Sequence, residues 1–117
     1  VYVAETGGEV VGSGVLHIRD RAHGQGEISY VIHPRLWGRG LATALGGRLL
    51  RIGFAEQGLH RIAATCDPRN RVSAAVLGKL GLVYEGLMRH TTKTADGWRD
   101  SQLYAILAER WGQFGTS

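Results

Sequence analysis

The spacing of apolar and polar residues predicts three strands in the first third of the chain. Residues 1–5 alternate and end at a Gly-Gly pair, a hairpin signal, and residues 10–18 form a second run whose two glycines indicate a bulge. A polar loop over residues 20–26 leads to a third strand over 27–33, which a proline ends. We therefore expect three consecutive strands before the first helix.

The longest helix is predicted over residues 40–57, where leucine and isoleucine recur every three or four positions. Gly58 ends it, because glycine readily adopts the left-handed conformation that follows many helices. Residues 60–66 form a short apolar strand, and Asn70 is a good N-cap for a second helix that Gly81 closes. One strand is therefore expected between two helices.

The C-terminal third of the chain predicts a hairpin. Residues 83–93 and 98–107 are strand-like runs joined by a turn that contains Asp-Gly, and residues 108–117 form a short helix or a frayed tail. The order strand, strand, strand, helix, strand, helix, strand, strand predicts an α/β fold with a mixed sheet. The 117 residues are enough for one core, so we expect a single domain over 1–117.

Composition narrows the classes of partner. The net charge is +4, and twelve of the fourteen basic residues are arginines spread along the chain, which suits a small polyanionic ligand. Neither a basic helix nor an aromatic platform is apparent, so we expect no nucleic-acid partner. No window approaches the roughly 20 apolar residues of a membrane span, so we expect no membrane partner.

Cysteine and histidine usage argues against disulfide and metal chemistry. Cys66 is the one cysteine, so no intrachain disulfide can form and a cytoplasmic location is expected. Its apolar surroundings favour a packed strand residue over a nucleophile. The five histidines show no ligand spacing, so we expect no metal site.

The most informative segment is the loop over residues 32–43. It places a strand end, a proline and two glycines spaced by one residue directly before a helical pattern. Helix N-termini present unpaired N–H groups to anions, and glycines let a phosphate approach the backbone. Arg35 and Arg39 add positive charge, so we expect this loop to bind a pyrophosphate.

Two familiar phosphate motifs do not fit the loop. A P-loop needs Lys-Ser or Lys-Thr after its second glycine, where Leu41 and Ala42 stand, and a dinucleotide-binding turn needs a third glycine. The pattern Arg35-x-x-Gly38-x-Gly40 resembles the acetyl-CoA loop of the GNAT (Gcn5-related N-acetyltransferase) superfamily, whose signature is Gln/Arg-x-x-Gly-x-Gly/Ala. By itself the loop equally fits a glycine-rich turn between a strand and a helix.

A second motif strengthens this resemblance. Residues 70–86 are similar to the N-x-x-S-x-x-x-L-x-K-x-G-F-x-x-E-G stretch of the ribosomal-protein N-terminal acetyltransferase branch, with Leu82 in place of the phenylalanine. The element order over residues 1–107 also resembles the GNAT fold from its second strand onward. The resemblance implies a mixed, mostly antiparallel sheet with helices on its faces. It also implies that the first strand and first helices are lacking, so that the domain is N-terminally incomplete.

The resemblance implies acetyl-CoA as co-substrate. The loop backbone would surround the pyrophosphate, and the pantetheine arm would pair with the strand end like an extra strand. The implied cofactor contacts are Val31, Ile32, His33, Arg35, Trp37, Gly38, Arg39, Gly40, Leu41, Ala42, Thr43, Asn70 and Lys79.

Acetyl transfer to an amine needs a base and a proton donor for the leaving thiolate. Glu27 is the candidate base, because the family often places a catalytic glutamate there, although a strand glutamate paired with an arginine is the simpler reading. Ser73 is the preferred thiolate partner over Tyr84, although serines at helix starts commonly bind the backbone. Asn70 has two compatible roles, as N-cap and as a polar contact to the pantetheine arm, although the cap alone would explain it.

The leading hypothesis is an N-acetyltransferase that moves acetyl from acetyl-CoA to a primary amine, by direct attack in a ternary complex. A protein N-terminal α-amine is the preferred acceptor. A polyamine or aminoglycoside acceptor is an alternative, although few acidic residues are available to bind such a cation. The remaining alternative is a non-catalytic acyl-CoA-binding module. A homodimer is one arrangement that would cover the expected sheet edge at residues 1–5. The acids available to a cationic acceptor are Glu27, Glu85, Asp96 and Asp100.

Overall fold

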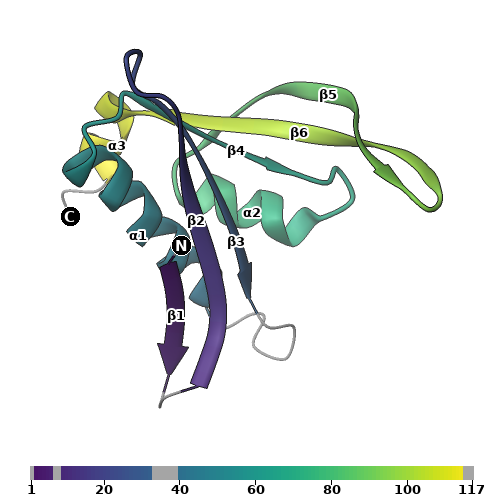
Figure 1. Cartoon of the computed structure of the whole chain (residues 1–117), viewed down its shortest axis with the longest axis horizontal. Helices are drawn as coiled ribbons and strands as arrows, with labels where there is room; N and C mark the ends of the chain where they lie inside the picture. The colour runs from purple at the N-terminus through teal and green to yellow at the C-terminus, as the bar shows by residue number, and fades with distance from the viewer. Residues whose placement is uncertain (1, 7–8, 33–39, 115–117) are drawn as a thin grey trace.

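The computed structural model describes residues 2–6, 9–32 and 40–114, which form one mixed sheet with helices. The six strands lie in the order β1-β2-β3-β4-β6-β5, and every neighbouring pair is antiparallel except β3 with β4. Figure 1 shows their arrangement. The strands are β1 (Tyr2–Thr6), β2 (Glu9–Asp20), β3 (Gln25–Ile32), β4 (Arg61–Cys66), β5 (Val83–Thr94) and β6 (Gly97–Leu107).

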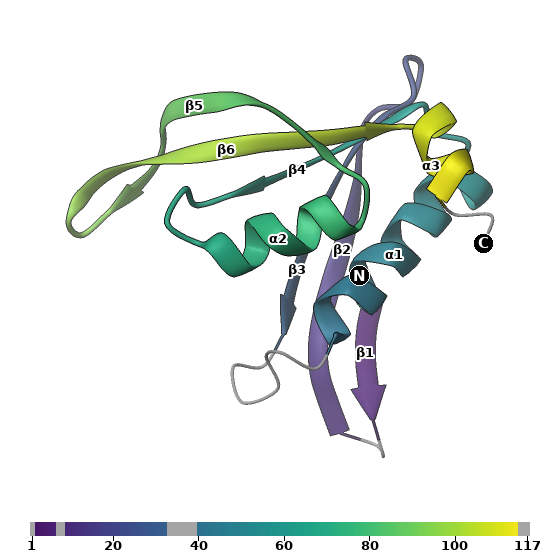
Figure 2. The same ribbon diagram turned by 180° about the vertical axis from the view of Figure 1, so that it is seen from behind.

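The described helices cover one face of this sheet, as the view from behind shows (Figure 2). Their buried side chains meet Ile28, Ile62 and Ile106 of the central strands in one core. Strands β2 and β3 face the viewer in Figure 1 without a described helix in front of them. The helices are α1 (Leu41–Arg51), η2 (Ile52–Glu56), α2 (Arg71–Lys79) and α3 (Ala108–Phe114).

The predicted long helix changes form before its end. It is α-helical only to Arg51, and a π-helical turn over Ile52–Glu56 completes it. A Cβ at Gly53 would collide with the Ile62 side chain, so this glycine lets the turn lie directly on the sheet. Gly58 follows with φ of +66°, which confirms the predicted stop.

The first helix also approaches the second closely through a glycine. A Cβ at Gly46 would lie 2.5 Å from Leu80 Cδ1 and 3.6 Å from the Tyr30 ring. Real Cβ atoms do not come as close as the first of these distances, because dense interiors leave no room for overlap. Gly46 is therefore what lets α1 approach the end of α2 and the third strand.

One detail of the predicted strands is wrong. The loop expected over residues 20–26 is shorter, because Asp20 still pairs with Gln25 and its carboxylate accepts the His23 N–H at 3.2 Å. The bulge predicted in the second strand is present: the register shifts beside Gly12, between its pairing with Ala4 and the pairing of Val10 with Glu5. A Cβ at Gly12 would lie 2.5 Å from the Val31 carbonyl oxygen on the neighbouring strand.

Gly14 is likewise regularly paired. It faces Tyr2 on one side and Tyr30 on the other, and a Cβ there would lie 2.8 Å from Leu49 Cδ1. The glycines of this strand are thus explained by close packing against neighbouring atoms. Among the described strands, β1 pairs with β2 alone, in agreement with the sheet edge expected at residues 1–5.

An ion pair ties the other sheet edge to the centre. Arg61 on β4 reaches Glu85 on β5 with two hydrogen bonds, of 2.8 and 2.7 Å, although β6 lies between these strands. The hydrogen bonds from Arg61 hold the pKa of Glu85 below its ordinary value. Such a bidentate pair restrains the edge strand through its side chain as well as its backbone ladder.

We expect Glu85→Gln to lower the free energy of unfolding at pH 7 by up to about 1 kcal/mol, because the pair is partly exposed. A lowered carboxyl pKa stabilises the fold above about pH 4.3 and the effect is lost as the pH falls through the lowered pKa. The difference between variant and wild type should therefore fade by pH 3 in urea titrations. Glu56→Gln, at an exposed position, is the control, and an undiminished difference at pH 3 would contradict the assignment.

Candidate active-site cleft

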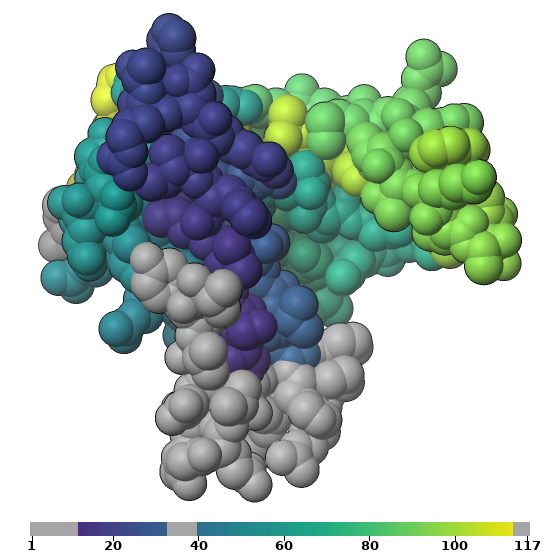
Figure 3. All heavy atoms as spheres, in the orientation of Figure 1, coloured from purple at the N-terminus to yellow at the C-terminus, as the bar shows by residue number. Residues whose placement is uncertain are grey.

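The decisive feature of the sheet is the separation of β3 from β4. The two strands pair in parallel only from Gln25 to Glu27, opposite Arg61 to Ala63. Beyond this point β3 continues to Ile32 and β4 to Cys66 without pairing to each other, and Figure 1 shows them diverging. The surface is also hollowed between β3 and the C-terminal hairpin (Figure 3). A wedge thus opens in the middle of the sheet.

A cleft of about 600 Å³ lies at this wedge. No described residue of its lining is acidic, whereas Arg71 and Lys79 contribute positive charge. An apolar cleft with a few polar groups and cations suits a ligand that is long, partly apolar and anionic. The lining residues are Tyr30, Val31, Ile32, Gly40, Leu41, Ala42, Thr43, Asn70, Arg71, Val72, Ser73, Ala75, Val76 and Lys79.

The backbone of β3 presents alternate residues to the wedge. The Val31 carbonyl lies 2.5 Å from where a Cβ of Gly12 would stand, so it faces β2. Because backbone groups alternate in direction along a strand, those of Tyr30 and Ile32 face the side from which β4 has diverged. Among the predicted cofactor contacts on this strand, the backbone groups of Ile32 therefore face the wedge, and those of Val31 face β2.

The first turns of α1 and α2 both line the cleft. Gly40 precedes α1 with φ of +74°, has no side chain to cap the helix, and is followed by a first turn without acidic residues. The first N–H groups of a helix lack partners within it and carry partial positive charge. Leu41, Ala42 and Thr43, which line the cleft, therefore present this helix end to any bound anion.

Asn70 caps the second helix as predicted. Its Oδ1 accepts the Ser73 N–H at 2.9 Å, a bond typical of N-caps and worth about 1 kcal/mol. Ser73 is half-buried in the cleft wall, with its backbone used by the cap and its hydroxyl free of any described hydrogen bond. Lys79, at the far end of the helix, also lines the cleft.

Tyr30 belongs to the cleft and was missed in the sequence. Its hydroxyl is buried and has no hydrogen-bond partner among the described residues. Burial, reinforced by the electrostatic effect of Cys66, raises the Tyr30 pKa to about 12, so the phenol is neutral at physiological pH. The alternation of residues 26–32 indicates that Tyr30 shares the buried face of Ile28, but no local pattern shows that its hydroxyl is unpaired.

The remaining catalytic candidates lie away from the cleft lining. Glu27 stands at the apex of the wedge, in the last pair before the strands diverge, but on the sheet face opposite Ile28 and the helices. The Arg19 guanidinium holds its carboxylate, with Nε at 2.8 Å and Nη2 at 2.6 Å. Tyr84 is 49% exposed and packs edge-on against Tyr104, outside the cleft.

Several predicted cofactor contacts fall outside the described residues. These are His33, Arg35, Trp37, Gly38 and Arg39. Within the described part of the chain, no group of three or more His, Cys, Asp or Glu side chains is arranged to hold a metal ion. No described helix is long and apolar enough to cross a membrane.

Cys66 lies buried at the end of β4, as expected of a packed residue. Its Sγ is 3.8 Å from Gln102 Oε1, and burial raises the pKa of the thiol. A raised pKa leaves little of the reactive thiolate at neutral pH. The thiol therefore contributes to packing between the diverging strands.

Comparison with known proteins identifies the family. The model of the acetyltransferase (GNAT) domain matches residues 1–83. The chain belongs to the GNAT family. A GNAT family acetyltransferase from Bacillus anthracis has the same fold, with a TM-score of 0.78 and 37% identity over 86% of this chain and 60% of that one. The mixed, mostly antiparallel α/β fold predicted from the sequence is thus confirmed.

Named GNAT relatives differ in what they act on. The chain is 39% identical to the uncharacterized N-acetyltransferase YnaD of Bacillus subtilis over 73% of this chain and 50% of that protein. It is 30% identical to the [ribosomal protein uS5]-alanine N-acetyltransferase of Escherichia coli over 72% of this chain and 43% of that protein. Spermidine N-acetyltransferase SpeG of Vibrio cholerae shares the fold, with a TM-score of 0.87 and 23% identity over 97% of this chain and 68% of that one.

We expect Tyr30→Phe to raise the free energy of unfolding by up to about 1 kcal/mol without ligand, because it removes a buried, unpaired hydroxyl. A raised tyrosine pKa favours the fold below about pH 10 and the benefit is lost as the pH rises towards 12. Wild type should therefore lose more stability than the variant over this range in urea titrations. Tyr84→Phe, at a half-exposed ring, is the control, and a destabilised Tyr30→Phe would show that the hydroxyl has a partner.

Proposed function

We propose that this GNAT domain binds acetyl-CoA in the wedge cleft and transfers the acetyl group to a primary amine by direct attack in a ternary complex. The observation that carries the proposal is the junction of the diverging strands with two helix N-termini, in a cleft that has cations and no described acid. The chain spans about half the length of the first of its curated relatives, 50% of YnaD, so the activity of the whole protein is part of the proposal.

The cofactor would be held mainly by backbone groups. The pyrophosphate would bind the first turn of α1 together with the preceding loop, where Arg35 and Arg39 add charge. The pantetheine arm would run along the side of β3 that faces the wedge, beside Val31 and Ile32, and pass Asn70. Because a paired backbone N–H there also polarises a nearby carbonyl, the strand would stabilise the oxyanion of the thioester.

The proton transfers would involve groups on both sides of the wedge. Glu27 would accept the proton of the amine, through water, from the apex on the open sheet face. Ser73 would donate a hydrogen bond to the leaving thiolate from the helix side. Support for this division is geometric: Ser73 lines the cleft, whereas Glu27 marks where the strands separate.

A protein N-terminal α-amine is the proposed acceptor. Its pKa of about 8 leaves more neutral amine at pH 7 than the pKa of about 10.4 of a lysine. A polyamine is less well supported, because the Glu27 and Glu85 carboxylates are already paired with arginines and Asp100 accepts a backbone N–H. Measured turnover would distinguish this enzyme from a module that only binds acyl-CoA.

The cofactor site can be tested with a matched pair of glycine variants. Gly40→Trp should weaken acetyl-CoA binding about tenfold or more in calorimetry, because the indole would occupy the cleft at the start of α1. Gly58→Trp is the control: it has a similar left-handed φ, equally open space and an exposed position away from the cleft. Equal affinity in both variants would contradict the placement of the cofactor.

The proposed catalytic pair predicts two different pH–rate profiles. Glu27→Gln should reduce kcat/KM about 10²-fold at pH 7, with a deficit that shrinks as the pH approaches the pKa of the amine. Ser73→Ala should lower kcat without that pH dependence, while its backbone N–H still caps the helix. Glu85→Gln, another ion-paired carboxylate, is the control, and a Glu27→Gln profile parallel to wild type would exclude Glu27 as the base.

A further inference from the structure

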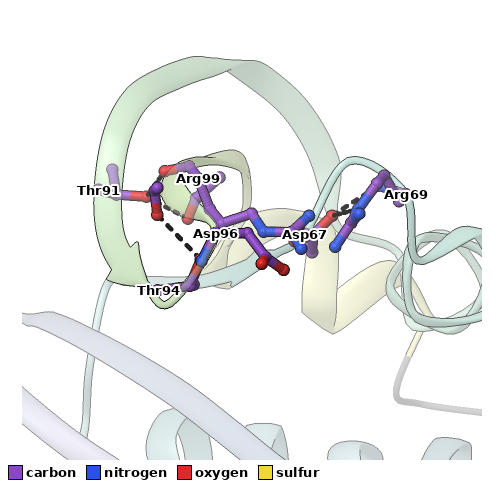
Figure 4. Close-up of polar contacts among 8 residues, drawn as sticks. Asp67, Arg69, Thr91, Thr94, Asp96 and Arg99 are labelled. Carbon is purple, nitrogen blue, oxygen red and sulfur yellow. Dashed lines mark hydrogen bonds and ion pairs between the residues drawn. The ribbon is translucent and has the colours of Figure 1, made fainter.

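A second cavity, of about 420 Å³, lies beyond the wedge between β4 and the β5–β6 hairpin. We call it the hairpin pocket, and Figure 4 shows most of its charged groups. Unlike the cofactor cleft, it is lined mainly by charged side chains and hydroxyls. Its lining residues are Thr65, Cys66, Asp67, Arg69, Thr92, Thr94, Arg99, Asp100 and Ser101.

Arg99 is the cation of the hairpin pocket whose ion pair is the longest: it meets Asp67 without forming a hydrogen bond. Its side chain is only 26% exposed and extends from the hairpin towards Asp67, whose Oδ2 is 3.9 Å away, too far for a hydrogen bond (Figure 4). The other oxygen of Asp67 already accepts from the Arg69 backbone at 2.8 Å and from its Nε at 3.4 Å. Among the described residues, the Arg99 guanidinium therefore makes no hydrogen bond, and its donors face the pocket.

The two carboxylates of the pocket accept hydrogen bonds from backbone N–H groups of the protein. Asp100 Oδ1 accepts the His90 N–H at 2.9 Å and so holds His90 in a left-handed conformation, with φ of +53°. A non-glycine residue in this region is strained and persists only where its surroundings fix it. The carboxylates of Asp67 and Asp100 therefore stabilise the backbone that forms the wall of the pocket.

The pocket suits one particular class of anion. A carboxylate matches the planar fork of one guanidinium, and the hydroxyls of Thr65 and Thr92, which make no described hydrogen bond, supply further donors. A phosphate dianion would carry twice the charge past Asp67 and Asp100, with the Arg99 guanidinium as the cation whose hydrogen-bond donors are available. The balance of charges therefore favours a carboxylate.

The hairpin pocket is one turn of chain from the cofactor cleft. Asp67 lines the pocket and Asn70 lines the cleft, and the Asn70 N–H donates to the Asp67 carbonyl at 2.9 Å. Three residues span at most about 11 Å between Cα atoms. The two cavities are therefore separated along the chain by the turn from Asp67 to Asn70, a span shorter than a dipeptide with its side chains.

We propose that the hairpin pocket binds a carboxylate of the amine acceptor, through Arg99 and the neighbouring threonine hydroxyls. The inference rests on the proposed acetyltransferase function and narrows its acceptor to an amine that carries an acid group, such as a free amino acid, a short peptide or an acidic N-terminal sequence. It gives the pocket a role in substrate selection that is separate from cofactor binding.

Binding can be tested with a matched pair of probes, N-acetylglycine and its neutral amide, titrated into the ¹⁵N-labelled chain. N-acetylglycine should shift the amide signals of Thr65, Thr92 and Ser101 saturably, and the neutral amide should not. Arg99→Gln should weaken this binding about tenfold or more. Arg89→Gln, at an exposed position on the same hairpin, should leave it unchanged, and the dispersion of the spectra reports whether each variant is folded.

The outcomes separate this inference from the proposed function. Equal shifts with both probes, or binding unaffected by Arg99→Gln, would overturn the pocket assignment even if acetyl-CoA binds. Loss of acetyl-CoA binding with intact carboxylate binding would overturn the function and leave the pocket. Alanylglycine should be acetylated at least about tenfold more efficiently than alanylglycinamide, and only with Arg99 present. Equal rates, or no transfer to alanylglycine by a chain that binds both ligands, would overturn the link to the acceptor.

Discussion

The short parallel contact between β3 and β4 is the constraint on which the site depends. Three paired residues on each strand fix the centre of the sheet, and the strands then diverge around Tyr30 and Cys66. Because the opened edge of β3 lies beside both helix N-termini, one divergence creates a cleft with backbone groups on one wall and helix ends on the other. A longer parallel pairing would have used the same backbone groups within the sheet.

Helix packing keeps this opening in place. Gly46 lets α1 approach Leu80 at the end of α2, while Leu77 of α2 is fully buried against the sheet. The last helix adds to this, because the tilted rings of Phe54 and Trp111 lie 5.4 Å apart between centroids and Arg110 donates to the Gly81 carbonyl at 2.7 Å. Because a densely packed interior resists displacement of its side chains, these contacts fix the first turns of α1 and α2 relative to the strands.

Most of the carboxylates discussed above bind arginines of the protein, whereas several cations line the two cavities. The carboxylates of Glu27 and Glu85 are paired with arginines on the strands, and that of Asp67 accepts from Arg69. The cleft retains Arg71 and Lys79, and the hairpin pocket retains Arg99. These carboxylates thus hold strands and turns, and some of the cations of the chain line the two cavities.

Sequence alone determined what depends on neighbours a few positions apart. The Asn70 cap, the Gly58 stop and the periods of strands and helices are local, because they arise from hydrogen bonds and side-chain spacing within single elements. The two family motifs are local as well, which is why the fold was predictable.

Tertiary structure decided which of these residues meet. Three contacts depend on how separate strands and turns pack together: the buried Tyr30 hydroxyl without a described partner, the ion pair of Arg19 with Glu27, and the long ion pair of Arg99 with Asp67. Spacing along the chain cannot supply these contacts, because burial and charge pairing are set by packing between segments that are distant in sequence.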